Sequence, residues 1–130
     1  MTFKKWLFPY VFDSSSLINV ERSKKMTILR RRKDEVLIPE KVAVEINQPN
    51  TPLHRFISNF REVVTRFEND EEEEYLRVRS QVGIDDGEAA AIAMAIKRRL
   101  TLIIDDKKAK QKAEKHGVPT HTWQDFVQGH

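Results

Sequence analysis

Residues 84–106 have the sequence IDDGEAAAIAMAIKRRLTLIIDD, which predicts a helix, a buried strand and a pair of acids in that order. Glu88–Leu100 consists largely of alanine and other strong helix formers. Acidic residues precede it and basic residues end it, as the helix dipole favours. Thr101–Ile104 is apolar and rich in β-branched residues, which is typical of a strand buried on both faces. Asp105 and Asp106 follow directly, so this stretch predicts an α/β protein.

The same alternation extends toward the N-terminus. Trp6–Phe12 is an apolar run that predicts a first buried strand, and Ser14–Ser16 supply hydroxyls suited to the start of a helix. Val36–Ile38 predicts a second strand, and Pro39 after it favours the first turn of a helix. Leu53–Phe60 has apolar residues at helical spacing and predicts a further helix.

The remaining segments complete the pattern. Val63–Val64 forms a small strand or the end of the preceding helix. A lysine-rich helix follows Asp106 and stops at Gly117, and residues 120–127, THTWQDFV, are consistent with a last strand and a short helix. Buried strands that alternate with helices predict a central parallel sheet covered by helices on both faces.

Composition limits the possible functions. The 130 residues are 39% hydrophobic and 33% charged, which predicts a single soluble domain over residues 1–130. No cysteine is present, which excludes disulfides, thiolate zinc sites and cysteine nucleophiles. The apolar start is broken by Pro9 and Asp13, and no run reaches the roughly 18–20 apolar residues of a membrane span. We therefore expect a cytoplasmic protein with no membrane segment.

Charge is distributed in blocks, although the net charge of +3 is mild. Arg22–Lys33 contains seven basic residues and no acid, and Lys107–Lys115 is basic with one glutamate. Glu68–Glu74, ENDEEEE, has six acids and predicts a solvated face or loop. The basic blocks either solvate the surface or contact RNA phosphates. The candidates for phosphate contact are Arg30, Arg31, Arg32, Lys107 and Lys108.

Acidic residues occur where a ligand site is expected. Ligands of open parallel sheets gather beyond the carboxyl ends of the strands, and Asp13 and the pair Asp105–Asp106 follow predicted strands. Glu45 lies beside an apolar helix stripe, and Glu88 starts the alanine-rich helix. Helix capping or plain exposure also explains each acid taken alone. Together, oxygen ligands without His or Cys suit Mg²⁺ or Mn²⁺ and the hydrolysis of a phosphodiester.

The order and spacing of these fragments resemble the PIN-domain nucleases over nearly the whole chain. The fragments are VFDSSSLI (11–18), IPEKVAVEI (38–46), DDGEAAAIAMAI (85–96), LIIDDKKAK (102–110) and HGVP (116–119). The resemblance implies a three-layer α/β/α domain with a central parallel sheet, and metal-dependent cleavage of RNA. Residues 50–81 match nothing specific in that family.

The resemblance also implies roles for individual residues. The catalytic acids match Asp13, Glu45, Glu88 and Asp106, and the metal ligands match Asp13, Glu88, Asp105 and Asp106. Asp106 is slightly favoured over Asp105 as the last ligand. Ser15 and Asp85 match supporting positions. Many small family members are toxins of VapC type, so a cognate antitoxin is an expected partner. An antitoxin or a homodimer would cover apolar residues such as Phe3 and Trp6.

Two other classes of function are alternatives. The first is a PIN-like module that binds RNA or a protein without cutting, although the complete set of acids argues against it. The second is another α/β phosphate enzyme. A phosphatase with an aspartyl nucleophile needs a second Asp two residues after Asp13, where this chain has Ser15. A receiver domain needs its acid pair early in the chain, whereas Asp105 and Asp106 come late.

Overall fold

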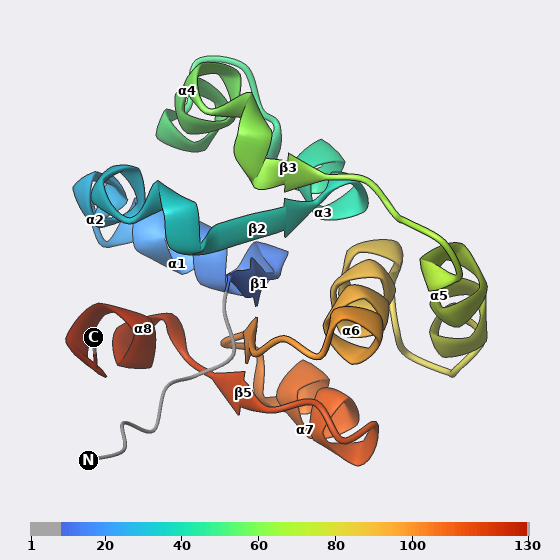
Figure 1. The fold of residues 1–130 in the computed structure, drawn as a ribbon. Helices are drawn as coiled ribbons and strands as arrows, with labels where there is room; N and C mark the ends of the chain where they lie inside the picture. Colours follow the sequence, from blue (N-terminus) through green and yellow to red (C-terminus); the bar gives the residue numbers. More distant parts are fainter. Residues whose placement is uncertain (1–8, 130) are drawn as a thin grey trace, which may run out of the picture.

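The computed structural model describes residues 9–129 and contains a five-stranded sheet in which every strand pair is parallel. The order of the strands is β3-β2-β1-β4-β5 (Figure 1). The strands are β1 (Tyr10–Phe12), β2 (Val36–Pro39), β3 (Val64–Thr65), β4 (Leu102–Ile103) and β5 (Thr120–His121). The predicted parallel sheet is therefore confirmed.

Helices cover both faces of the sheet. They are α1 (Ser14–Arg22), α2 (Met26–Arg31), α3 (Glu40–Ile46), α4 (Pro52–Asn59), α5 (Glu71–Arg79), α6 (Asp86–Arg98), α7 (Lys107–Lys115) and α8 (Trp123–Gly129). The connection from β1 to β2 and that from β3 to β4 cross the sheet in opposite directions, so right-handed crossovers put their helices on opposite faces. Figure 1 shows α2 and α8 on one side of the strands and α6 and α7 on the other. The α/β/α class is confirmed.

Helix α6 lies at the centre of the packing and contacts β1, β2 and β4. Its residues from Ala89 to Ala95 are all buried. Small alanine side chains let the helix approach the sheet closely, so the alanine-rich sequence sets the distance between the two layers. On the far side of the sheet, Phe126 of α8 packs edge-to-face on Phe12, with ring centroids 5.1 Å apart.

Some predicted boundaries differ from the structure. The first strand is Tyr10–Phe12; of the predicted strand, Pro9 lies in a bend before it and residues 6–8 lie outside the described residues. Helix α6 starts at Asp86 rather than Glu88, because the Asp85 side chain caps the N–H of Glu88. Helix α2 was not predicted, since its basic residues hide its short apolar stripe. Within residues 9–129, none of the helices combines the length and apolar character needed to cross a membrane.

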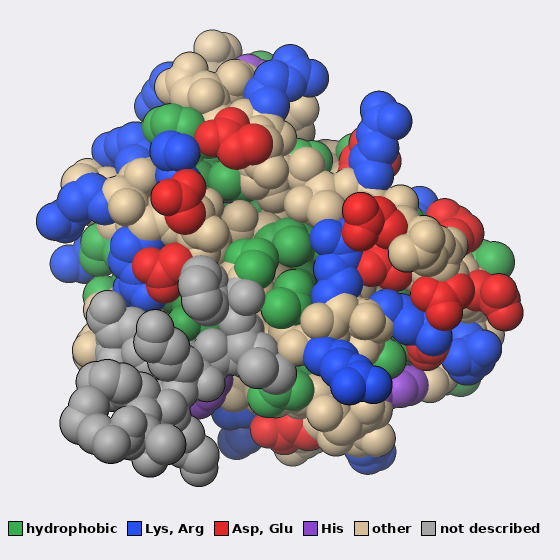
Figure 2. Space-filling view, viewed as in Figure 1, with side chains coloured by type: hydrophobic (Ala, Val, Ile, Leu, Met, Phe, Trp, Pro, Cys, Tyr) green, Lys and Arg blue, Asp and Glu red, His purple; other side chains and the backbone are tan. Residues whose placement is uncertain are grey.

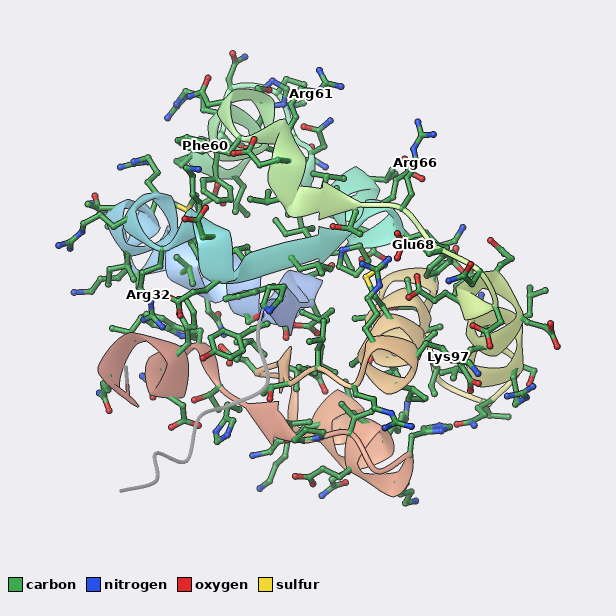
Figure 3. All side chains as sticks on the ribbon, in the orientation of Figure 1. Arg32, Phe60, Arg61, Arg66, Glu68 and Lys97 are labelled. Carbon is green, nitrogen blue, oxygen red and sulfur yellow. The ribbon has the colours of Figure 1, made fainter. Side chains whose placement is uncertain are left out.

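The prediction of a solvated face or loop for Glu68–Glu74 is wrong for two of its acids, whereas the rest of the run is exposed. Most of the run forms the first turn of α5, and Glu71 and Glu74 are buried. Nε of Arg98 lies 2.6 Å from Oε2 of Glu71, and Nζ of Lys97 lies 3.0 Å from the Asp70 carboxylate. Figure 2 shows charges of both signs interleaved over this region, and Figure 3 places Glu68 and Lys97 at the junction of α5 and α6. Glu71 and Glu74 are thus buried against α6, which the run of acids by itself does not indicate.

Candidate active site

The sheet topology predicts where a ligand binds. Strands β1 and β4 are neighbours, and the connections that leave them diverge, which makes their carboxyl ends the switch point where α/β proteins bind ligands. A cleft of about 250 Å³ opens there. It is lined by Asp13, Ser14, Ser15, Ile18, Glu45, Asp85, Glu88 and Asp106. Acids from four separate segments of the chain therefore share one cleft.

Asp13 forms the floor of this cleft and caps α1. Its Oδ1 accepts hydrogen bonds from the Ser16 N–H and hydroxyl, both at 3.1 Å, and from the Ser15 hydroxyl at 2.9 Å. The side chain is only 3% exposed. Burial raises the pKa of the Asp13 carboxyl from 3.8 to about 7, although the hydrogen bonds from Ser16 and Ser15 lower it. A carboxylate this deeply buried is costly to ionise without a cation.

Ser15 joins the two strand ends that meet at the cleft. Its hydroxyl donates to Asp13 and accepts from the backbone N–H groups of Asp105, at 3.1 Å, and Asp106, at 3.3 Å. One side chain thus links the end of β1 to the end of β4. This is the kind of supporting position that the family resemblance implies for Ser15.

Glu45 reaches the cleft from α3. Its Oε1 accepts a 2.5 Å hydrogen bond from the Ser14 hydroxyl, and its Oε2 accepts a 3.2 Å hydrogen bond from the backbone N–H of Gly87. Sequence reasoning missed both donors. The sequence contains no clear signal for Gly87, because the predicted helix starts after it at Glu88, whereas α6 starts at Asp86.

Glu88 and Asp85 form a capping box at the start of α6. Asp85 Oδ1 accepts from the Glu88 N–H at 2.9 Å, and Glu88 Oε1 accepts from the Asp85 N–H at 3.2 Å. Glu88 is half-buried, and this burial raises the pKa of its carboxyl above 4.5. Capping and participation in the cleft therefore coexist in the same two residues.

The pair Asp105–Asp106 divides into two roles. Asp105 accepts from Nδ2 of Asn19 at 2.5 Å and from the backbone N–H of Trp123 at 2.9 Å, so both of its oxygens bind within the fold. Asp106 caps α7 through a 3.0 Å bond from the Ala109 N–H and lines the cleft. Asp106 therefore lies in the site, whereas the Asp105 carboxylate binds α1 and α8.

The predicted RNA-contacting residues lie in two different places. Lys107 and Lys108 are exposed and directly follow Asp106, at the edge of the cleft. Arg30 and Arg31 are exposed on α2, which precedes β2 and so lies toward the amino ends of the strands. Arg32 is engaged within the fold. Its guanidinium donates to Glu35 at 3.0 Å and to the Phe126 carbonyl at 2.5 Å, and it stacks over the Phe126 ring (Figure 3).

The donor set of the cleft fits a hard divalent cation. Asp13, Glu45, Glu88 and Asp106 offer oxygen only, which suits Mg²⁺ or Mn²⁺. The buried Asp13 carboxylate is the group that a cation would stabilise most. Within residues 9–129, no three acidic or histidine side chains are close enough as they stand to hold an ion. Binding therefore requires some of these side chains to rotate toward each other.

A larger hollow lies elsewhere. A cavity of about 520 Å³ is bordered by α3, α4 and β3, and Glu40 is its one acidic lining residue among those described. Arg66 already pairs with that carboxylate at 3.3 Å. The chemistry of the side chains, and not the volume of the space, therefore identifies the smaller acidic cleft as the candidate active site.

Comparisons with known proteins agree with this geometry. No curated protein matches the sequence. The crystal structure of PAE2754 from Pyrobaculum aerophilum is similar in fold, with a TM-score of 0.55 and 18% identity over 85% of this chain and 89% of that chain. A family model described as a PIN domain matches residues 9–122, the part of the chain that contains every acid of the cleft. The chain therefore belongs to the PIN domain family.

Proposed function

We propose that the protein is a Mg²⁺- or Mn²⁺-dependent endoribonuclease that hydrolyses RNA phosphodiester bonds. PIN domains are generally nucleases, and those nucleases typically use divalent metals. The observation that supports this function most directly is the cleft itself. Four carboxylates from separate segments converge at the switch point of the sheet, and the deepest of them, Asp13, is buried.

The residues of the cleft have distinct parts in this mechanism. Asp13, Glu88 and Asp106 would hold the metal, which supplies an activated water and a positive charge near the leaving oxygen when bound. Ser15 keeps the Asp13 carboxylate aimed at the cleft. Glu45, which lines the same cleft from α3, would strengthen the binding of the metal and accept a hydrogen bond from water at the site. Lys107 and Lys108 neutralise phosphates of the RNA strand at the edge of the cleft.

We further propose a biological setting. The chain is the toxin of a toxin–antitoxin pair, acts in the cytoplasm, binds a cognate antitoxin and forms a homodimer. The apolar N-terminal residues that suggested such a partner lie outside the described residues, so the setting rests on the resemblance to toxins of VapC type. Co-purification of the chain with the product of an adjacent gene, and its mass in solution, are the measurements that test it.

A second candidate is a PIN-like module that binds RNA or a protein without cleavage. One observation favours it: within the described residues, no three ligand-type side chains form a ready-made metal group. A module of this kind keeps the basic edge at Lys107 and Lys108 but has no need of an ionised Asp13. The two candidates therefore differ in their requirement for metal.

The test is cleavage of a mixed pool of single-stranded and structured RNAs by the purified chain, with Mg²⁺, with Mn²⁺ and with EDTA. We expect cleavage with either metal and none with EDTA. Asp13→Asn should abolish it, whereas Asp34→Asn, the same change on an exposed side chain before β2, should not. Cleavage that persists in Asp13→Asn contradicts the proposal. RNA binding without metal and without cleavage selects the second candidate.

A further inference from the structure

The position of Glu45 in the cleft depends on two neighbours that no catalytic motif contains. We infer that Ser14 and Gly87 are positioning residues, which together fix the Glu45 carboxylate against the start of α6. This inference rests on the proposed function only in treating Glu45 as an acid of the active site. The geometry that supports it is independent of any reaction.

Each oxygen of the Glu45 carboxylate has its own donor, and the donors come from different helices. The Ser14 hydroxyl at the start of α1 lies 2.5 Å from Oε1, and the Gly87 N–H in the first turn of α6 lies 3.2 Å from Oε2. Glu45 is an exposed residue on α3, and an exposed glutamate ordinarily samples several rotamers. Two donors from separate elements hold this one in a single orientation that bridges three helices.

Gly87 also supplies the space for this carboxylate. A Cβ at position 87 would lie 2.6 Å from Cδ of Glu45 and 2.8 Å from its Oε2, and would overlap Oε1. The backbone does not require glycine here, because its φ angle is not in the left-handed region. Alanine is a better helix former, and three alanines, at positions 89–91, follow Glu88 in α6. The absence of a side chain at position 87 is therefore explained by the carboxylate that occupies its place.

Substitution at position 87 should displace the Glu45 carboxylate without unfolding the protein. In Gly87→Ala the new methyl group meets the flexible end of a glutamate side chain, so Glu45 swings out of the cleft and the backbone stays in place. Helix α6 gains a better helix former, and Glu45 loses its hydrogen bonds from the Gly87 N–H and the Ser14 hydroxyl. The fold survives, and the carboxylate leaves its position.

The first test is a thermal unfolding cycle without metal, on the wild type, Gly87→Ala, Glu45→Ala and the double variant. With Glu45 present, the methyl group displaces the carboxylate, so the melting temperature changes little. With Glu45 removed, the methyl group fits, and the same substitution should raise the melting temperature by about 3 °C. Equal shifts in the two backgrounds overturn the inference, because they mean that Gly87 and Glu45 do not interact.

The second test is the affinity for Mn²⁺, measured by calorimetry. Ser14→Ala and Gly87→Ala should each weaken binding about tenfold, as is usual when a residue that orients a metal-site acid is lost. Ser14→Thr keeps the hydroxyl and should retain the affinity, and Ser23→Ala, at the other end of α1, is the matched control. In the Glu45→Ala background neither substitution should weaken binding further. A further loss there overturns the inference.

The two tests distinguish failure of the proposed function from failure of the positioning role. If the wild type neither binds Mn²⁺ nor cleaves RNA, the proposed function fails, and the unfolding cycle still decides whether Ser14 and Gly87 position Glu45. If the wild type binds Mn²⁺ and cleaves RNA but the melting shifts are equal in both backgrounds, the proposed function stands and the positioning role is rejected.

Discussion

Two acidic side chains of this protein are equally buried and have opposite surroundings. Asp13 at the end of β1 and Glu71 at the start of α5 are each 3% exposed. Glu71 receives two hydrogen bonds from the guanidinium of Arg98, at 2.6 and 3.0 Å. Asp13 receives hydrogen bonds from serine hydroxyls and a backbone N–H, and in the part of the chain that the structure describes no cation pairs with it.

The difference distinguishes a structural acid from a candidate catalytic one. A buried charge that has its own guanidinium partner is compensated within the protein, and it connects α5 to α6. A buried carboxylate with neutral donors alone is uncompensated, and a cation from solution lowers its free energy when it ionises. Burial by itself does not identify a site, whereas burial without a partner at the switch point of the sheet does.

The largest expected effect concerns catalysis. Asp13→Asn should lower the rate of metal-dependent RNA cleavage by about 10³-fold or more, because it removes charge that holds the metal. Glu71→Gln, the same kind of change at an equally buried acid, should leave the rate within about threefold. Single-turnover cleavage at saturating Mg²⁺ measures both. Equal losses in the two variants mean that burial, and not the cleft, explains the effect.

The second effect is a loss of stability when the ion pair between α5 and α6 is broken. Arg98→Ala leaves the Glu71 carboxylate buried without its partner and should lower the free energy of unfolding by about 3–5 kcal/mol at pH 7. Arg55→Ala, on the exposed face of α4, should change it by less than about 0.5 kcal/mol. Urea unfolding at low salt measures the difference. A loss of less than about 1 kcal/mol in Arg98→Ala would show that the pair is not the link between α5 and α6.

The third effect is a pH dependence that belongs to Asp13. Its folded pKa of about 7 exceeds its ordinary value of 3.8, so the folded state binds more protons between these values. The free energy of unfolding should therefore fall as pH rises from about 4 to about 7 and change no further above that. In metal-free buffer, Asp13→Asn should be more stable than the wild type by roughly 2–4 kcal/mol at pH 8 and equally stable near pH 4.

The pH experiment also has a metal control. Added Mg²⁺ should stabilise the wild type at pH 8 and leave Asp13→Asn unchanged, because the ion binds the folded carboxylate and not the amide. A difference between the two proteins that stays constant from pH 4 to pH 8 contradicts the assignment of the raised pKa to Asp13.

Much of the fold was predictable from local sequence. The alanine-rich stretch followed by TLII predicts a helix and then a buried strand, and the structure has α6 and β4 at these positions. The burial of Glu71 was not predictable, because its partner Arg98 is 27 residues away and a run of acids looks solvated by itself. Tertiary pairing overrides the local signal there.

The site likewise contains residues that local sequence predicts and residues that it does not. Strand ends followed by acids identified Asp13 and the pair at 105–106, since the carboxyl ends of parallel strands meet at one edge of the sheet. The choice within the pair depends on Asn19 and Trp123, which bind Asp105 from distant segments. The role of Gly87 depends on the position of the Glu45 carboxylate, which comes from a helix 42 residues earlier in the chain and is not predictable from local sequence.

The smallest expected effect compares the charges at the cleft with those at the opposite end of the strands. Replacing Lys107 and Lys108 by alanine should weaken binding of single-stranded RNA and reduce the slope of log affinity against log salt by about 1, because phosphate contacts near the cleft are lost. The matched pair, Arg30 and Arg31 on α2, should change the slope by less than about 0.3. Fluorescence anisotropy with Asp13→Asn as the background prevents cleavage during the titration. If the α2 pair changes the slope as much as the lysines do, RNA extends around the molecule to the amino ends of the strands, and the acidic cleft accounts for only part of its path.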